Sequence, residues 1–233
     1  MEICIHHHLG LGDHFDMNGL VRYVYERYAD KVYVFSKSNY FGMIEFMYRD
    51  EPNIVVVKID KDKSEDKQVA AFLEGTPQVF HVRIGFENYP TGNEIKEDKN
   101  CWEYFYEQVG IDLSVRSDYF HVDREDKEEE KLLKELNPTG GPFTFIHDDP
   151  ERGFVIDPNT LRSGTTEIRN DNSKNIFHYL TILEEAEEVH CMESSFKTLI
   201  DLYSLRPTLY FHDFRGHPLG TQTTRKWHTV TYE

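Results

Sequence analysis

The feature that most constrains the fold is an alternation of short Val- and Ile-rich runs with longer segments of helical periodicity. The runs EICIH (2–6), KVYVFSK (31–37) and NIVVVKID (53–60) predict buried strands, because they are short, apolar and bounded by polar residues. Residues 13–28 and 64–75 instead repeat apolar side chains with a period near 3.6, which predicts helices. Strands that alternate with helices are typical of βαβ units, so the sequence predicts an α/β fold with parallel sheets.

The same alternation continues through the rest of the chain. Further strands are expected at 78–86, 143–149, 165–171, 188–193 and 207–214. Further helices are expected at 39–49, 100–110, 124–136, 175–186 and 194–205. The helix at 124–136 mixes opposite charges at four-residue spacing and has few apolar residues, which predicts a solvent-exposed helix.

The Pro- and Gly-rich segment NPTGGP (137–142) is the best linker in the sequence. It predicts two Rossmann-like halves, at 1–138 and 142–233, with a cleft between them. Ligands of open parallel sheets bind beyond the carboxyl ends of the strands. The residues expected there are His7–Asp13, Ser36, Gly85–Asn88, His147–Gly153, Glu193–Ser195, His212 and Asp213.

The composition excludes several classes of protein. The net charge of −16 argues against a nucleic-acid binder, which normally carries a basic face. No stretch reaches the roughly 18–20 apolar residues that span a bilayer, and no signal-peptide pattern begins the sequence. Three widely spaced cysteines fit neither a disulfide framework nor a Cys4 zinc site, so a cytoplasmic protein is expected. The oligomeric state is not visible in the sequence.

Three adjacent histidines precede the turn Gly10-Leu-Gly12-Asp13, between the first strand and the first helix. The third glycine of a dinucleotide-binding fingerprint is missing, so a Rossmann cofactor site is not indicated. Asp13 is either a helix cap or a general base that faces the cleft, with Gly10 and Gly12 admitting a ligand. Consecutive histidines of a strand alternate in direction and fit a metal poorly. Because they lie near the end of the strand and beside Asp13, His7, His8 and His14 are instead candidates for lining the cleft.

Two segments of the second half carry candidate anion sites. In HDDPERGF (147–154), Arg152 is a candidate diphosphate ligand, and a solvent-exposed turn is the alternative; His147 and Asp148 are possible cleft-lining residues, and a metal there is disfavoured. In HCMESSF (190–196), Ser194 and Ser195 begin a helix whose free N–H groups attract anions, or they only cap it. Glu193 would accept hydrogen bonds from sugar hydroxyls. No nucleophile elbow, zinc-protease motif or Walker A sequence occurs.

The segments GLGDHFDMNGLVR (10–22) and AEEVHCMESSFKTLIDLYSLRPTLYFHD (186–213) resemble GT-B glycosyltransferases of the heptosyltransferase type. The paired serines also resemble a fucosyltransferase nucleotide-sugar site, and the whole is similar to poorly characterised bacterial and viral glycosyltransferases. The resemblance implies Asp13 as the base, Arg152 as the diphosphate ligand, and Glu193, Ser194 and Ser195 as donor contacts. It also implies an acceptor-side domain at 1–138, a nucleotide-sugar-binding domain at 142–233, no essential metal and no cofactor beyond the nucleotide-sugar substrate.

The resemblance rests on about forty residues, and two features depart from it. The chain is short for the fold, and Glu193 stands where heptosyltransferases have Asp, which leaves the donor nucleotide open. The expected function is transfer of a sugar from a nucleotide-diphosphate donor to an acceptor hydroxyl. The alternatives are a sugar-nucleotide epimerase or hydrolase on the same fold, a non-catalytic nucleotide-sugar-binding protein, and, more distantly, a metal enzyme that uses the histidines.

Overall fold

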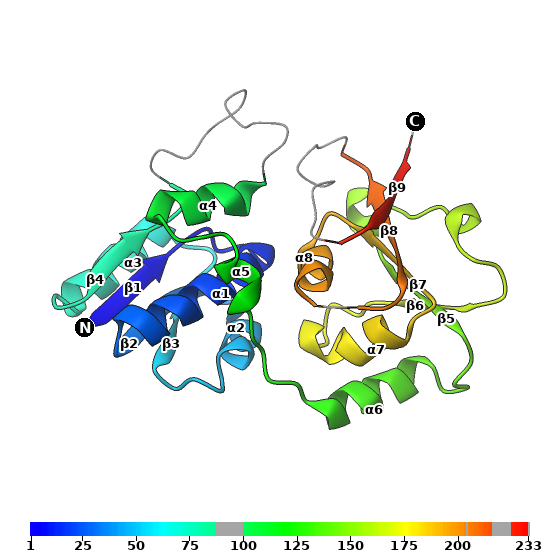
Figure 1. Cartoon of the computed structure of the whole chain (residues 1–233), viewed down its shortest axis with the longest axis horizontal. Coiled ribbons are helices and arrows are strands. Elements are labelled where there is room, and N and C mark those ends of the chain that lie inside the picture. The colour runs from blue at the N-terminus through cyan, green and yellow to red at the C-terminus, as the bar shows by residue number, and fades with distance from the viewer. Residues whose placement is uncertain (87–99, 204, 216–224, 233) are drawn as a thin grey trace. The chain divides into compact units, whose positions relative to one another are not determined.

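The computed structural model describes residues 1–86, 100–203, 205–215 and 225–232. The chain forms two compact units, Met1–Asp123 and Arg124–Glu233, each with its own parallel sheet (Figure 1). Both sheets are covered by helices, as the alternating pattern predicts for parallel strands.

The first unit is built on a four-stranded parallel sheet with the order β3-β2-β1-β4. Its strands are β1 (Glu2–His6), β2 (Lys31–Lys37), β3 (Ile54–Ile59) and β4 (Phe80–Arg83). Its helices are α1 (Leu11–Tyr28), α2 (Phe41–Met47), α3 (Glu65–Gly75), α4 (Cys101–Val109) and α5 (Val115–Asp118). The strands predicted at 2–6, 31–37 and 53–60 are confirmed to within one residue at each end.

One face of this sheet packs against α3. Cys4 and Phe35 belong to a buried cluster that includes Val69 of α3, and Phe72 of the same helix packs against them. The Ser64 hydroxyl accepts a hydrogen bond from the Lys67 amide and thereby caps the N-terminus of α3. The local cap and the apolar stripe thus agree on where the helix begins and which face it buries.

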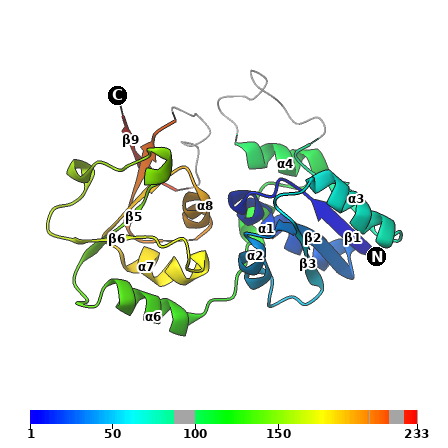
Figure 2. The same cartoon turned by 180° about the vertical axis from the view of Figure 1, so that it is seen from behind.

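The second unit is built on a five-stranded parallel sheet with the order β6-β5-β7-β8-β9. Its strands are β5 (Phe143–His147), β6 (Thr166–Arg169), β7 (Glu188–Met192), β8 (Thr208–Asp213) and β9 (Trp227–Thr231). Its α-helices are α6 (Asp126–Leu136), α7 (Leu180–Glu185) and α8 (Ser195–Leu202). Figure 2 shows α6 beside α7, as Figure 1 does from the other side.

The boundary between the units differs from the predicted linker at 137–142, because it falls between Asp123 and Arg124. Helix α6 therefore belongs to the second unit. The predicted solvent-exposed helix is confirmed for most of its residues, but Glu129 is fully buried and accepts hydrogen bonds from Arg124 and from the hydroxyl of Thr181. Charge-rich composition hid a specific ion pair that docks the helix.

The predictions about disulfides and membrane-spanning segments are compared here with the described residues. All three cysteines are free thiols, and Cys4 and Cys191 are buried. No described helix combines the length and the apolar character needed to cross a membrane.

Gly19 allows the close approach of α1 and α5. A Cβ at this position would lie 2.3 Å from the carbonyl oxygen of Val115 and 2.8 Å from that of Arg116. We expect Gly19→Ala to lower the free energy of unfolding by about 1–3 kcal/mol, because backbone atoms must move. Urea unfolding measures this cost.

Gly42 of α2 is the matched control, since a Cβ there meets no atom within 4 Å. Gly42→Ala is expected to raise the free energy of unfolding by up to about 1 kcal/mol through helix propensity. Equal effects of the two replacements would contradict the packing argument at Gly19.

Candidate functional site

Asp13 lies in the first turn of α1, just beyond the carboxyl end of β1. Its Oδ2 accepts a hydrogen bond from the Gly10 amide at 3.2 Å, and a Cβ at position 10 would lie 2.6 Å from that oxygen. Burial raises the pKa of Asp13 to about 7; nearby Asp16 adds to the rise, while the Gly10 amide and Lys37 oppose it. Asp13 is therefore both a capping residue and a carboxyl group that titrates near neutral pH, which suits a general base.

The three neighbouring histidines have different environments. His7 and His14 are fully buried, and their rings pack edge to face with centroids 4.7 Å apart. Burial lowers the pKa of His7 to about 4 and that of His14 well below its usual value, so both rings are neutral at pH 7. His8 Nε2 lies 2.7 Å from the carbonyl oxygen of Gly85. The cleft-lining prediction does not fit His7 and His14, whose rings belong to the core.

The strand-end residues expected after β4 are described only in part. Ile84 and Gly85 continue from the strand, and the Gly85 amide donates to Gln108 Oε1 at 2.7 Å. Residues 87 and 88 of the predicted strand end lie outside the described residues.

In the second unit, the turn after β5 holds Arg152. Its Nε donates to Asp149 Oδ2 at 2.5 Å, and its guanidinium lies 5.4 Å from the centroid of the Phe154 ring. The guanidinium of Arg215, which follows β8, lies 5.5 Å from the same ring. The structure therefore places two exposed arginines around Phe154. Sequence reasoning missed Arg215, although its place directly after a predicted strand was a usable signal.

His147 and Asp148 have structural partners. His147 Nδ1 lies 2.7 Å from Asn170 Oδ1, and its ring packs on Phe196. The Asp148 carboxylate pairs with Arg169 at 2.6 Å and accepts the Ile156 amide at 3.1 Å. Both residues thus make hydrogen bonds within the second unit, and both contacts of Asp148 involve its Oδ2.

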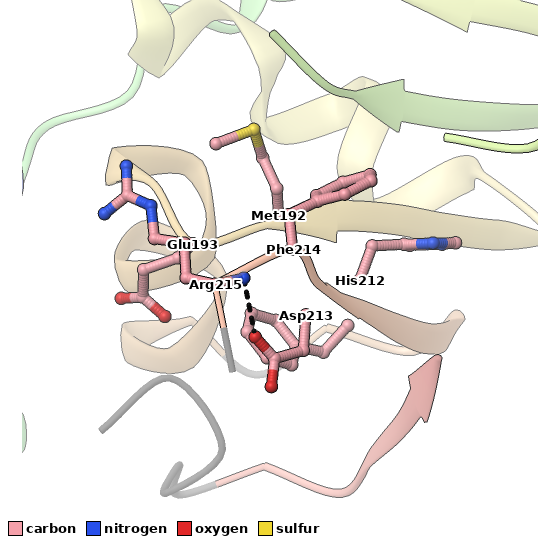
Figure 3. A pocket seen from close by; sticks show the side chains of 7 residues that line it. Met192, Glu193, His212, Asp213, Phe214 and Arg215 are labelled. Atoms are coloured by element: carbon pink, nitrogen blue, oxygen red, sulfur yellow. Dashed lines mark hydrogen bonds between the residues drawn. The ribbon is translucent and has the colours of Figure 1, made fainter. Parts of the chain in front are cut away.

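A small pocket opens at the carboxyl ends of β7 and β8, shown in Figure 3. Its lining comprises Met192, Glu193, Phe211, His212, Asp213, Phe214 and Arg215. Glu193 Oε2 is buried and, within the described part of the chain, has no hydrogen-bond partner. A carboxylate oxygen in that state is an acceptor for a ligand hydroxyl.

The serines beside Glu193 begin α8. The Ser194 hydroxyl accepts a hydrogen bond from the Lys197 amide at 3.4 Å and donates to the Met192 carbonyl oxygen at 3.2 Å. Ser194 is thus the N-cap, and Ser195 is the first helical residue. The capping alternative holds for Ser194, while the helix start still presents backbone N–H groups to the same edge as the pocket.

Asp50, His121 and Asp123 form a group of possible metal ligands in the first unit, with ligand atoms within 4.8 Å of one another. Both Asp50 oxygens accept hydrogen bonds from Arg22 at 2.8 Å, and His121 Nε2 lies 2.9 Å from Asp123 Oδ1. Since a guanidinium already neutralises Asp50, these contacts explain the group without a cation.

Comparison with known proteins gives a likeness in structure. No protein-family model matches the chain, and no curated protein matches it. The chain is similar to the glycosyl transferase family 9 structure from Veillonella parvula DSM 2008, with a TM-score of 0.59 and 10% identity, over 100% of this chain and 88% of that one. It is also similar to E. coli ADP-heptose lps heptosyltransferase II, with a TM-score of 0.59 and 10% identity, over 99% and 90%.

A third similar structure is E. coli heptosyltransferase WaaC with ADP, with a TM-score of 0.50 and 10% identity, over 100% of this chain and 94% of that one. Each match runs through both sheets of the chain. The predicted fold class is thereby confirmed: the chain has the two-unit, GT-B-like α/β fold of these glycosyltransferase structures.

Proposed function

We propose that the chain is a glycosyltransferase that moves a sugar from a nucleotide-diphosphate donor to an acceptor hydroxyl. The observation that carries the proposal is the likeness, over the whole chain, to glycosyltransferase structures. Fold alone does not specify chemistry, so the proposal also needs a base and a site for the leaving diphosphate. The two units supply one candidate for each.

Asp13 is the proposed base. Transfer requires the acceptor oxygen to lose its proton as it bonds to the anomeric carbon, while the bond from that carbon to the diphosphate oxygen breaks. A carboxylate with a pKa of about 7 accepts such a proton more readily than an ordinary aspartate does. Gly10 has no side chain beside this carboxylate, and a Cβ there would lie 2.6 Å from Asp13 Oδ2.

The donor is proposed to bind at the carboxyl edge of the second sheet. Arg152 and Arg215 would pair with the diphosphate, because guanidinium groups bind phosphate oxygens through two parallel hydrogen bonds. The N–H groups at the start of α8, at Ser195, add to this anion site. Oε2 of Glu193 would accept a hydrogen bond from a hydroxyl of the sugar or ribose.

Arg152→Ala is expected to weaken donor binding about 10- to 100-fold, since a hydrogen bond to a charged group contributes about 1.5–3 kcal/mol. Calorimetric titration with nucleotide sugars measures the change. Arg162→Ala is the matched control, because both arginines are just over half exposed and each has one carboxylate partner, Asp149 for Arg152 and Glu187 for Arg162. Equal binding by the two variants would remove Arg152 from the donor site.

The donor is found with a panel of ADP-, UDP-, GDP-, CMP- and dTDP-sugars. ADP-sugars come first, because one similar structure is named for ADP-heptose and another contains ADP. A ligand at about 100 times its dissociation constant adds about 2.7 kcal/mol to the free energy of unfolding. No shift with any nucleotide sugar would count against both a transferase and a nucleotide-sugar-binding protein.

Turnover separates the remaining alternatives. A transferase needs an acceptor, whereas an epimerase or hydrolase consumes the nucleotide sugar alone. We also propose that transfer needs no metal ion and that the protein is cytoplasmic. A chelator is expected to leave the transfer rate unchanged, and loss of activity that added metal restores would contradict metal independence.

A further inference from the structure

The second sheet contains a continuous chain of hydrogen-bonding side chains. Glu188 Oε2 lies 3.3 Å from His190 Nε2, and His190 Nδ1 lies 2.9 Å from His212 Nε2. His212 Nδ1 lies 2.6 Å from the hydroxyl oxygen of Tyr232, which also accepts the Asp157 amide at 3.4 Å. Both imidazole rings are fully buried, so water does not replace these partners.

With neutral rings, this chain has only one arrangement of its hydrogens. The Glu188 carboxylate accepts, so His190 carries its hydrogen on Nε2 and accepts at Nδ1. His212 must then donate from Nε2 and accept at Nδ1, which leaves Tyr232 as the donor to His212. The hydroxyl hydrogen of Tyr232 is therefore used in the hydrogen bond to His212.

One additional proton reverses the direction of the hydrogen bond between His212 and Tyr232. If it resides on His190, His190 donates from Nδ1, and His212 must accept at Nε2 and donate from Nδ1. If it resides on His212, that ring donates from both nitrogens. In either case His212 Nδ1 becomes a donor to the Tyr232 oxygen, and the Tyr232 hydrogen turns outward.

The Tyr232 end of this series of hydrogen bonds lies beside the pocket described above. His212 lines this pocket, and so does Phe214, whose ring stacks on Tyr232 with centroids 4.4 Å apart and planes 12° apart. Three other groups face the pair. Tyr210 stacks on His190, and the ring of His228 is tilted against that of Tyr210. The third is the carboxylate of Asp148, which Arg169 neutralises. Protonation thus adds a positive charge and a free O–H donor beside the proposed donor site.

We propose that His190 and His212 form a one-proton switch that couples proton uptake to the binding of an anionic ligand at the carboxyl edge of the second sheet. The coupling to a ligand rests on the proposed function, whereas the switch itself does not. Because an anion stabilises the protonated pair, ligand binding takes up a proton, and affinity rises as the pH falls.

The switch is tested first in the free protein, by nitrogen NMR of the histidine rings. Both His190 and His212 are expected to carry hydrogen on Nε2 at neutral pH, and acidification is expected to place hydrogen on His212 Nδ1. Any other neutral pattern, or acidification without that change, overturns the switch whatever the protein binds. Tyr232→Phe retains the ring that stacks on Phe214 and removes the hydroxyl that bonds His212 Nδ1 and accepts the Asp157 amide.

The coupling is tested by calorimetric titration with ADP-glucose, whose diphosphate is a diester with constant charge between pH 6 and 8. Buffers of different ionisation enthalpy then report proton uptake by the protein. Where one proton is taken up per ligand, affinity is expected to rise about tenfold per pH unit lowered. The uptake should vanish when His190 and His212 are both replaced by Gln, and persist in His178→Gln, whose ring instead binds Glu125.

The possible outcomes separate the inference from the proposed function. Binding without proton uptake overturns the coupling while the donor site stands. Uptake that persists when both His190 and His212 are replaced by Gln assigns the proton to another group and also overturns the coupling. If ADP-glucose and the rest of the nucleotide panel fail to bind, the proposed function and the ligand coupling are both wrong, and the NMR result alone decides the switch.

Discussion

Asp13→Asn is expected to lower the rate of sugar transfer by about 10²- to 10⁴-fold, the usual contribution of a positioned general base. The amide keeps an oxygen that accepts the Gly10 amide hydrogen bond, so the start of α1 should remain intact. The amide cannot, however, take up the proton of the hydroxyl that attacks the sugar. Steady-state rates at saturating donor and acceptor measure the loss, and Glu26→Gln, an exposed change on the same helix, should leave them unchanged.

The pH dependence gives this prediction a sign. Because the Asp13 pKa is raised to about 7, the rate should fall roughly tenfold per unit below pH 7, where the carboxyl group is protonated. The same shift means that the folded state binds more protons than the unfolded state between the ordinary pKa and 7. The carboxyl group therefore contributes less stability as the pH rises through 7, and Asp13→Asn should be relatively more stable at pH 8 than at pH 5.

Two results would contradict this assignment. A variant that keeps its wild-type rate would show that Asp13 is a cap and nothing more. A variant that loses activity together with its cooperative unfolding transition would show a structural role. Unchanged nucleotide-sugar binding by Asp13→Asn is expected in any case, since the proposed donor residues belong to the other unit.

The periodicity of the sequence predicted most of the fold because strands and helices are encoded locally. It missed β9 (Trp227–Thr231), whose run WHTVT has only two apolar residues and is largely exposed. It also missed α5, a four-residue turn of helix held by Asp16 and Gly19 of α1. Such elements are fixed by distant partners, which periodicity does not reveal.

The candidate site divides in the same way. Asp13 and Arg152 come within a few residues of the ends of predicted strands, so chain order alone indicated them. The contact of Arg215 with Phe154 and the chain from Glu188 to Tyr232 join segments far apart in sequence. Even the boundary between the units depended on such a contact, because Arg124 binds Glu129 and Glu184 within the second unit.

The second large effect is expected at the buried ion pair of Asp16 and Arg116. Asp16 Oδ1 accepts hydrogen bonds from Arg116 Nε at 2.9 Å and from Arg116 Nη2 at 2.6 Å, and both side chains are 4% exposed. Asp16→Ala leaves a buried guanidinium without its carboxylate, which should cost about 3–5 kcal/mol. That is a large part of the total stability of a typical domain, so urea unfolding should show a much earlier transition for the first unit.

The control for this loss is Asp66→Ala, which breaks the Arg83–Asp66 pair of 3.0 Å, in which Asp66 is 74% exposed. That change should cost at most about 1 kcal/mol, because water already solvates both charges. Asp16→Ala combined with Arg116→Met should recover part of the loss, since no charge is then left buried. Equal costs for Asp16→Ala and Asp66→Ala would mean that burial adds nothing to the first pair, and α5 would then owe its place to the packing at Gly19.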